Sequence, residues 1–140
     1  MKAYTPIVVE RSDGTGSVRR MEATTVARQI AVARVALGAA LTVAPGVFTR
    51  IWVGERTTGA KVLGLGFGAR DVAIGTGLWH ALDSGADTRP WLVAGAAGDV
   101  ADLVGTLAAR RSLSPLGVSV AAVAASGAAL SLWAARQVAP

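Results

Sequence analysis

Apolar residues gather in four long stretches of the chain, which short polar segments separate. The stretches cover residues 25–44, 60–82, 90–109 and 116–135. Each is close to the roughly 20 residues that a helix needs to cross a bilayer. Prolines stand at or beside an end of the first, third and fourth stretches, where proline can terminate a helix or occupy its first turn. The pattern predicts an all-α fold, a four-helix transmembrane bundle with its spans in these ranges.

A shorter amphipathic segment follows the first of these spans. Apolar residues recur there at helical spacing, with polar residues between them: Val47, Phe48, Ile51 and Trp52. Such a pattern is typical of a helix that lies in the membrane surface with its apolar face turned inward. We therefore expect a short interfacial helix between the first two spans.

The start of the chain has a different character. Residues 1–23 are polar, with a short apolar run at 7–9 that favours a strand and a turn-forming cluster at 12–16. We expect residues 1–23 to form a tail and residues 24–140 to form the membrane domain.

Small residues line one face of the second and third stretches. In the second, a 3.6-residue period places Ala60, Gly64, Gly68, Asp71 and Gly75 together, and in the third it groups Gly95, Asp99, Asp102 and Thr106. Glycine lets neighbouring membrane helices approach closely. The sequence therefore predicts helix packing at six glycines: Gly64, Gly68, Gly75, Gly95, Gly98 and Gly105.

The four tryptophans fall near the ends of the expected spans. They are Trp52, Trp79, Trp91 and Trp133. Tryptophan is enriched where a membrane helix meets the lipid headgroups, so we interpret all four as interfacial anchors. The alternative is a soluble helical bundle with four tryptophans in its core.

Composition favours lipid over water as the surroundings of this chain. Hydrophobic residues make up 52% and charged residues 16% of the sequence, whereas soluble domains carry about 25% charged residues. The formal net charge is +5, but the basic residues are scattered and form no nucleic-acid patch. Cysteine is absent, which excludes disulfides and thiolate chemistry.

Five charged residues fall inside the expected spans: Arg34, Arg70, Asp71, Asp99 and Asp102. Each unpaired charge near the bilayer centre would cost at least about 2.5–3.5 kcal/mol, so we expect the five to meet between the helices. Antiparallel packing of the second and third spans would let Arg70 form two hydrogen bonds with Asp99 or Asp102. Arg34 could then reach Asp71 or the remaining aspartate. Two bases and three acids give the cluster a charge of −1.

Two details of this cluster stay open at the level of sequence. Arg70 and Asp71 are turned by about 100° from each other on a helix, and we expect them not to neutralise each other side by side. The cluster could fix the helix register, or its odd aspartate could bind a proton or a polar ligand in a cavity. His80, beside Asp83, is interpreted as an interfacial residue rather than a pH switch.

No catalytic set emerges from the sequence. Residues 64–69 match a loose dinucleotide-binding fingerprint, but that motif requires a preceding strand and a βαβ unit, which the helical pattern does not provide. The single histidine has no companions at metal-ligand spacing and completes no nucleophile–histidine–acid set. We therefore expect no enzyme activity, no catalytic or metal-binding residues and no cofactor.

Several short motifs resemble those of a known group of membrane proteins. They are Arg34-Val-Ala-Leu-Gly38, Gly68-Ala-Arg-Asp71 followed by Ala73-Ile-Gly75, and Gly98-Asp-Val-Ala-Asp102, with Pro45 after the first span. Over residues 28–136 the chain is similar to small four-helix membrane proteins of actinobacteria, loosely DoxX-like and mostly without an assigned activity. The resemblance implies a four-helix transmembrane bundle whose Gly-Ala-Arg and Asp motifs face inward.

These observations lead to a functional expectation. We expect a non-catalytic accessory or stabilising subunit in the bacterial plasma membrane, with the lipid bilayer and a larger membrane complex, or further copies of itself, as partners and no nucleic acid. The alternative is a small proton-linked carrier or ligand-binding protein that uses the charge cluster, and a redox or quinone-linked component is a weaker third reading. Basic residues near the spans divide evenly between the two sides, and Lys2 and Arg11 favour cytoplasmic termini.

Overall fold

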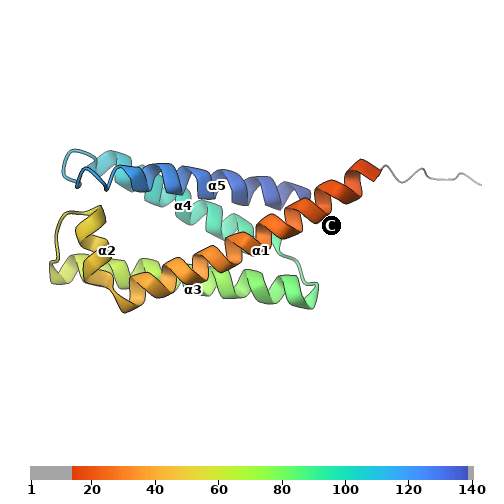
Figure 1. Ribbon diagram of the computed structural model, residues 1–140, viewed down its shortest axis with the longest axis horizontal. Coiled ribbons are helices and arrows are strands. Elements are labelled where there is room, and N and C mark those ends of the chain that lie inside the picture. The colour runs from red at the N-terminus through yellow and green to blue at the C-terminus, as the bar shows by residue number, and fades with distance from the viewer. Residues whose placement is uncertain (1–13, 139–140) are drawn as a thin grey trace, which may run out of the picture.

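The computed structural model describes residues 14–138, and these form five helices and no strand (Figure 1). Four of the helices are long and one is short. Their bounds are α1 Gly14–Val43, α2 Pro45–Trp52, α3 Thr58–Ser84, α4 Arg89–Ala109 and α5 Ser119–Gln137. The all-α prediction is therefore confirmed for the described residues, and the short helix after the first long one lies where it was expected.

Helix α1 begins earlier than the sequence suggested. The turn expected at residues 12–16 is wrong from Gly14 onward, because the helix already starts there. Ala23 is fully buried, and the Thr24 and Thr25 hydroxyls donate to carbonyls one turn back at 3.0 and 3.1 Å. Adding turns to an anchored helix costs little compared with starting one, so the polar turns continue α1. The strand expected at residues 7–9 lies outside the described residues.

Helix α5 begins later than expected, at Ser119 rather than at residue 116. Residues 115–118 form turns instead. The Ser114 hydroxyl donates to the Ile51 carbonyl and accepts the Gly117 N–H at 2.9 Å. These bonds tie the loop to the end of α2 and delay the start of the helix.

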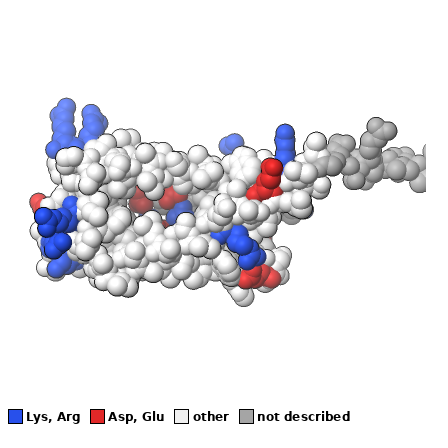
Figure 2. Space-filling view, viewed as in Figure 1, with Lys and Arg blue, Asp and Glu red and all other residues white. Residues whose placement is uncertain are grey.

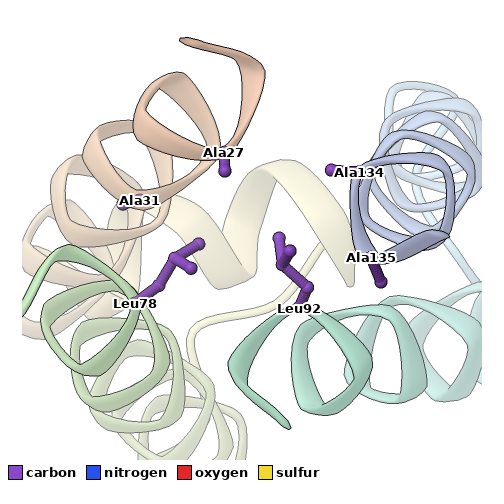
Figure 3. Close-up of a cluster of buried hydrophobic side chains, with 6 residues drawn as sticks. All are labelled: Ala27, Ala31, Leu78, Leu92, Ala134 and Ala135. Atoms are coloured by element: carbon purple, nitrogen blue, oxygen red, sulfur yellow. The ribbon is translucent and has the colours of Figure 1, made fainter. Parts of the chain in front are cut away.

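The long helices pack as two antiparallel pairs. Helix α1 lies along α3, and α4 lies along α5, while contacts of α1 with α5 and of α3 with α4 join the pairs (Figure 1). All four long helices contribute to one apolar cluster, in which Leu78 and Leu92 point toward each other between smaller side chains (Figure 3). The smaller side chains are Ala27, Ala31, Ala134 and Ala135.

Glycines allow the close approach of α1 and α3. A Cβ atom placed on Gly68 would lie 2.7 Å from the Gly38 carbonyl oxygen, and one on Gly75 would lie 2.8 Å from the Ala31 carbonyl oxygen. A side chain at either position would force the backbones apart. Gly64 instead faces α2, and a Cβ atom placed on it would lie 3.3 Å from the Thr49 methyl carbon.

One of the six predicted packing glycines makes no such contact. Gly105 is exposed, and a Cβ atom there would meet no heavy atom of the described residues within 4 Å. The expected face of α4 does turn inward at Gly95, Asp99 and Thr106, but Gly105 lies beside this face rather than on it. Helix α4 therefore packs through fewer glycines than its sequence indicated.

Three helices in the described part of the chain are long and apolar enough to cross a membrane: α1, α4 and α5. Helix α3 has 27 residues, but its glycines and its central Arg70 and Asp71 make it less apolar. Large hydrophobic side chains are exposed on every long helix, among them Val43, Val62, Leu63, Val104 and Val123. An apolar exterior of this kind is consistent with a membrane protein.

Candidate functional site: a buried chain of ionic contacts

Three helices carry the charged residues of the interior. Arg34 comes from the middle of α1, Arg70 and Asp71 from the middle of α3, and Asp99 and Asp102 from α4. Figure 2 shows charged atoms in a recess midway along an otherwise uncharged face, between the two helix pairs, while the other charges lie toward the two ends. The structure thus brings all five residues together.

Arg34 connects α1 to two other helices. Its Nη1 donates to Asp71 Oδ1 of α3 at 3.0 Å, and its Nη2 donates to Asp99 Oδ2 of α4. Arg34 is 7% exposed and Asp71 is 4% exposed. The sequence left open whether Arg34 would reach Asp71 or another aspartate, and in the structure it contacts both Asp71 and Asp99.

Arg70 connects α3 to α4. Its Nη1 and Nη2 donate to Asp102 Oδ1 and Oδ2 at 3.0 and 2.7 Å, the bidentate geometry that a planar guanidinium favours with a carboxylate. Of the two aspartates that the sequence offered to Arg70, the structure uses Asp102. Antiparallel packing of α3 and α4 places the two side chains at one level.

Arg70 also contacts its neighbour in the sequence, which corrects an expectation. Its Nε and Nη2 donate to Asp71 Oδ1 at 3.3 and 3.2 Å. On a helix the Cα–Cβ bonds of adjacent residues point about 100° apart, and the expectation rested on these directions alone. The arginine side chain is long enough to bring its guanidinium back over the short aspartate, so side-by-side neutralisation does occur.

The five residues form one continuous chain of alternating charge. Its order is Asp99, Arg34, Asp71, Arg70, Asp102. Asp71 holds the central place because its Oδ1 accepts hydrogen bonds from both arginines. Each arginine lies between two carboxylates, and each carboxylate contacts at least one arginine. The buried charges therefore satisfy one another at the cost of a single excess negative charge.

Glycines on α4 and α5 leave room for this chain. A Cβ atom on Gly95 would lie 2.9 Å from Arg34 Nη2, and one on Gly98 would lie 3.2 Å from Arg70 Cζ. On α5, a Cβ atom on Gly127 would lie 2.6 Å from Asp99 Oδ2. Gly127 was not predicted from the sequence. The signal was the single glycine of α5, a helix whose one charged residue is Arg136 in its last turn.

A second ion pair lies toward the end of the molecule that holds both termini of the described chain. Arg28 Nη2 donates to Asp83 Oδ1 at 2.9 Å, and the Arg28 guanidinium lies 4.9 Å from the centre of the Trp79 ring. Both charged side chains are nearly half exposed. The sequence analysis paired Asp83 with His80 and missed this contact, since Arg28 lies 55 residues before Asp83.

The ion pairs of the interior join α1, α3 and α4. Among residues 14–138, no group of three His, Cys, Asp or Glu residues could hold a metal ion. The carboxylates in the ionic chain are all engaged by guanidinium groups, and no serine, threonine or histidine takes part in it.

Comparison with known proteins adds no identification. No protein family, curated protein or solved structure matches the chain. The resemblance to DoxX-like proteins therefore stays a prediction, and any function must be argued from the residues themselves.

Proposed function

We propose that the chain is an integral membrane protein in which α1, α3, α4 and α5 all cross the bilayer and α2 lies at its surface. The distribution of charge supports this arrangement. Charged side chains lie either at the two ends of the molecule or inside the ionic chain (Figure 2). The surface between the ends presents apolar side chains to the surroundings, where lipid tails would cover them.

The proposal that α3 crosses the bilayer needs the most argument, because α3 is less apolar than the other long helices. At 1.5 Å per residue its 27 residues extend about 40 Å, which exceeds the roughly 30 Å of a hydrocarbon core. Its two central charges are paired with residues of α1 and α4. Buried pairing of this kind is how intramembrane charges are tolerated.

Within the membrane, the proposed role is that of a non-catalytic accessory subunit, which stabilises a larger complex in the bacterial plasma membrane. The observation that carries this proposal is that the buried charges pair internally, so the outer helix faces remain free for contact with another protein. On α5 these faces include exposed small residues one turn apart: Ala122, Ala125, Ser126 and Ala129. Small residues of this type favour close helix packing in membranes.

Affinity purification in a mild detergent tests the accessory role. A tagged chain should recover a larger membrane protein in a fixed ratio, and Ala125→Trp should lose that protein while the chain itself stays monodisperse. Leu130→Trp, at an exposed position that is already large, is the matched control and should retain the partner. Recovery of only a monodisperse homo-oligomer would contradict the proposal.

A second candidate is a small proton-linked carrier. The observations that favour it are the excess carboxylate of the ionic chain and the recess in which charged atoms are visible (Figure 2). In liposomes that contain the purified protein, a carrier would move protons across the membrane, and Asp102→Asn would abolish this movement without loss of expression. Equal proton flux in empty and protein-containing liposomes would exclude this candidate.

A further inference from the structure

A cavity of about 390 Å³ lies between α2, α3 and α4. Its volume falls within the roughly 300–1,000 Å³ of ordinary small-molecule sites. It lies toward the α2 end of the molecule, away from the apolar cluster of Figure 3. The ring of Phe67 lines the cavity and lies 5.4 Å from Arg70 Cζ, so this ring stands where the cavity and the ionic chain meet.

Three buried polar atoms of the cavity-lining residues have no hydrogen-bond partner within the described part of the protein. They are Thr49 Oγ1, Trp52 Nε1 and Thr106 Oγ1. Thr49 is 3% exposed and Thr106 is 2% exposed. Nearly all buried polar groups in proteins have a partner. Of the residues that the structure describes, only Ser131 holds another such atom, and it does not line the cavity.

The chemistry of these atoms defines what could satisfy them. The indole Nε1 can only donate a hydrogen bond, while threonine hydroxyls can donate or accept. A ligand that engages all three must therefore offer an acceptor oxygen. Thr49 and Trp52 are three residues apart on α2, so their side chains lie on one face of that helix, and Thr106 approaches from α4.

The rest of the lining defines the body and the charge of the ligand. Leu63, Phe67 and Leu113 supply apolar walls. Among residues 14–138, Glu55 is the only charged residue of the lining, and no lysine or arginine of this range lines the cavity to balance an anionic group. The cavity therefore disfavours carboxylates and phosphates and suits an uncharged molecule.

We propose that this cavity binds a neutral lipophilic ester, whose two oxygens together accept hydrogen bonds from Trp52, Thr49 and Thr106 while the apolar part contacts the leucine and phenylalanine side chains. This site adjoins the ionic chain at Phe67 but shares no residue with it, and it does not depend on the accessory role. Its test can fail while that role stands, and the reverse also holds.

Trp52 can report binding to this site directly. Replacing the other three tryptophans by phenylalanine leaves it as the sole tryptophan: Trp79→Phe, Trp91→Phe and Trp133→Phe. The detergent-purified protein is titrated with the methyl ester of a medium-chain fatty acid that bears a terminal bromine, a heavy atom that quenches indole fluorescence. We expect saturable quenching, with about five- to tenfold weaker binding in Thr106→Val, which removes one hydrogen bond and keeps the side-chain shape.

Two comparisons separate specific binding from partition into the micelle. A protein that retains Trp133 alone should show only unsaturable quenching, and a bromoalkane without a carbonyl should bind Trp52 at least fivefold more weakly than the ester. Gly105→Leu should abolish saturation in a folded protein, because Gly105 lines the cavity and has free space for a side chain.

Three results would overturn the proposal. One is quenching that does not saturate at Trp52. Another is equal affinity for the ester and the bromoalkane, which would reduce the cavity to an apolar void. The third is unchanged ester affinity in both Thr106→Val and Gly105→Leu, which would place the ester elsewhere.

Discussion

The guanidinium of Arg34 and the carboxylate of Asp71 meet at 3.0 Å between α1 and α3, although 37 residues separate them in the sequence. The same guanidinium also reaches Asp99 on α4. One side chain thus holds three helices at a common level. Because Asp71 accepts from Arg70 as well, a change at Arg34 acts on the whole ionic chain.

Removing the Arg34 guanidinium should therefore destabilise the protein strongly. Arg34→Ala leaves Asp71 with one partner and Asp99 with none among the residues of the ionic chain, and breaking a buried pair in this way costs about 3–5 kcal/mol. The free energy of unfolding, measured by SDS titration of the detergent-solubilised protein, should fall by about this amount. Arg28→Ala is the matched control, since its half-exposed pair with Asp83 should contribute about 0–1 kcal/mol. Equal losses in the two variants would show that burial gives the Arg34 contacts no special weight.

A double-mutant cycle can measure the contact between Arg70 and Asp102. Each single change to alanine leaves a partly buried charge without its bidentate partner, and we expect a loss of about 3 kcal/mol from either one. The double variant should lose less than the sum, with a coupling energy of about 1–3 kcal/mol. Recovery in the double variant would show that the charges serve the fold. Folded single variants that lose a cellular phenotype would instead mark the cluster as a working site.

A second double-mutant cycle, which combines Arg70→Ala with Asp99→Ala, is the control for the cycle of Arg70 with Asp102. These two residues belong to the same ionic chain but form no direct ion pair. Their coupling should therefore be clearly smaller than that of Arg70 with Asp102. If the two coupling energies are equal, the pairwise geometry does not describe the energetics of the cluster.

The sequence revealed which charges had to meet, but not how they meet. Five charges in apolar stretches cannot stay unpaired, and this argument alone placed Arg34 and Asp71 in one cluster. Arg70 pairs with Asp102 because of the position of α3 relative to α4 along the helix axes. No pattern in the sequence encodes this position. The contact of Arg70 with Asp71 depends on the side-chain rotamer, which helical periodicity ignores.

The glycines show the same limit: the sequence predicts which face of a helix is buried, but not which neighbour that face contacts. The 3.6-residue period correctly grouped the buried face of α3, because burial follows directly from the side of the helix on which a residue lies. It could not show that Gly64 faces α2 or that Gly105 faces open space. Gly127 became meaningful only when Asp99 was found 2.6 Å from where its Cβ would lie.

Two glycines of α3 offer a test of helix contact within one helix. In Gly68→Ala, the new methyl group would lie 2.7 Å from the Gly38 carbonyl oxygen and 2.9 Å from Leu41 Cβ, so α1 must shift. We expect a loss of about 1–3 kcal/mol. In Gly66→Ala the methyl group meets no atom of residues 14–138 within 4 Å, and the better helix propensity of alanine should leave stability unchanged or raise it by up to about 1 kcal/mol. Thermal midpoints in detergent compare the two, and a neutral Gly68→Ala would contradict direct backbone contact between α1 and α3.

Whether α3 crosses the membrane can be decided by labelling, because the chain contains no cysteine and every introduced cysteine is unique. We place one cysteine before α3 with Arg56→Cys and one after it with Ala86→Cys, both at exposed positions. If α3 spans the bilayer, a membrane-impermeant maleimide added to intact cells should label only one of the two, and the other should react only after lysis. Ser112→Cys, in the loop between α4 and α5, is the control and should behave like Arg56→Cys, because α3 and α4 together return the chain to the same side. Labelling of positions 56 and 86 from one side would mean that α3 does not cross the bilayer, which would contradict the proposed four-span arrangement.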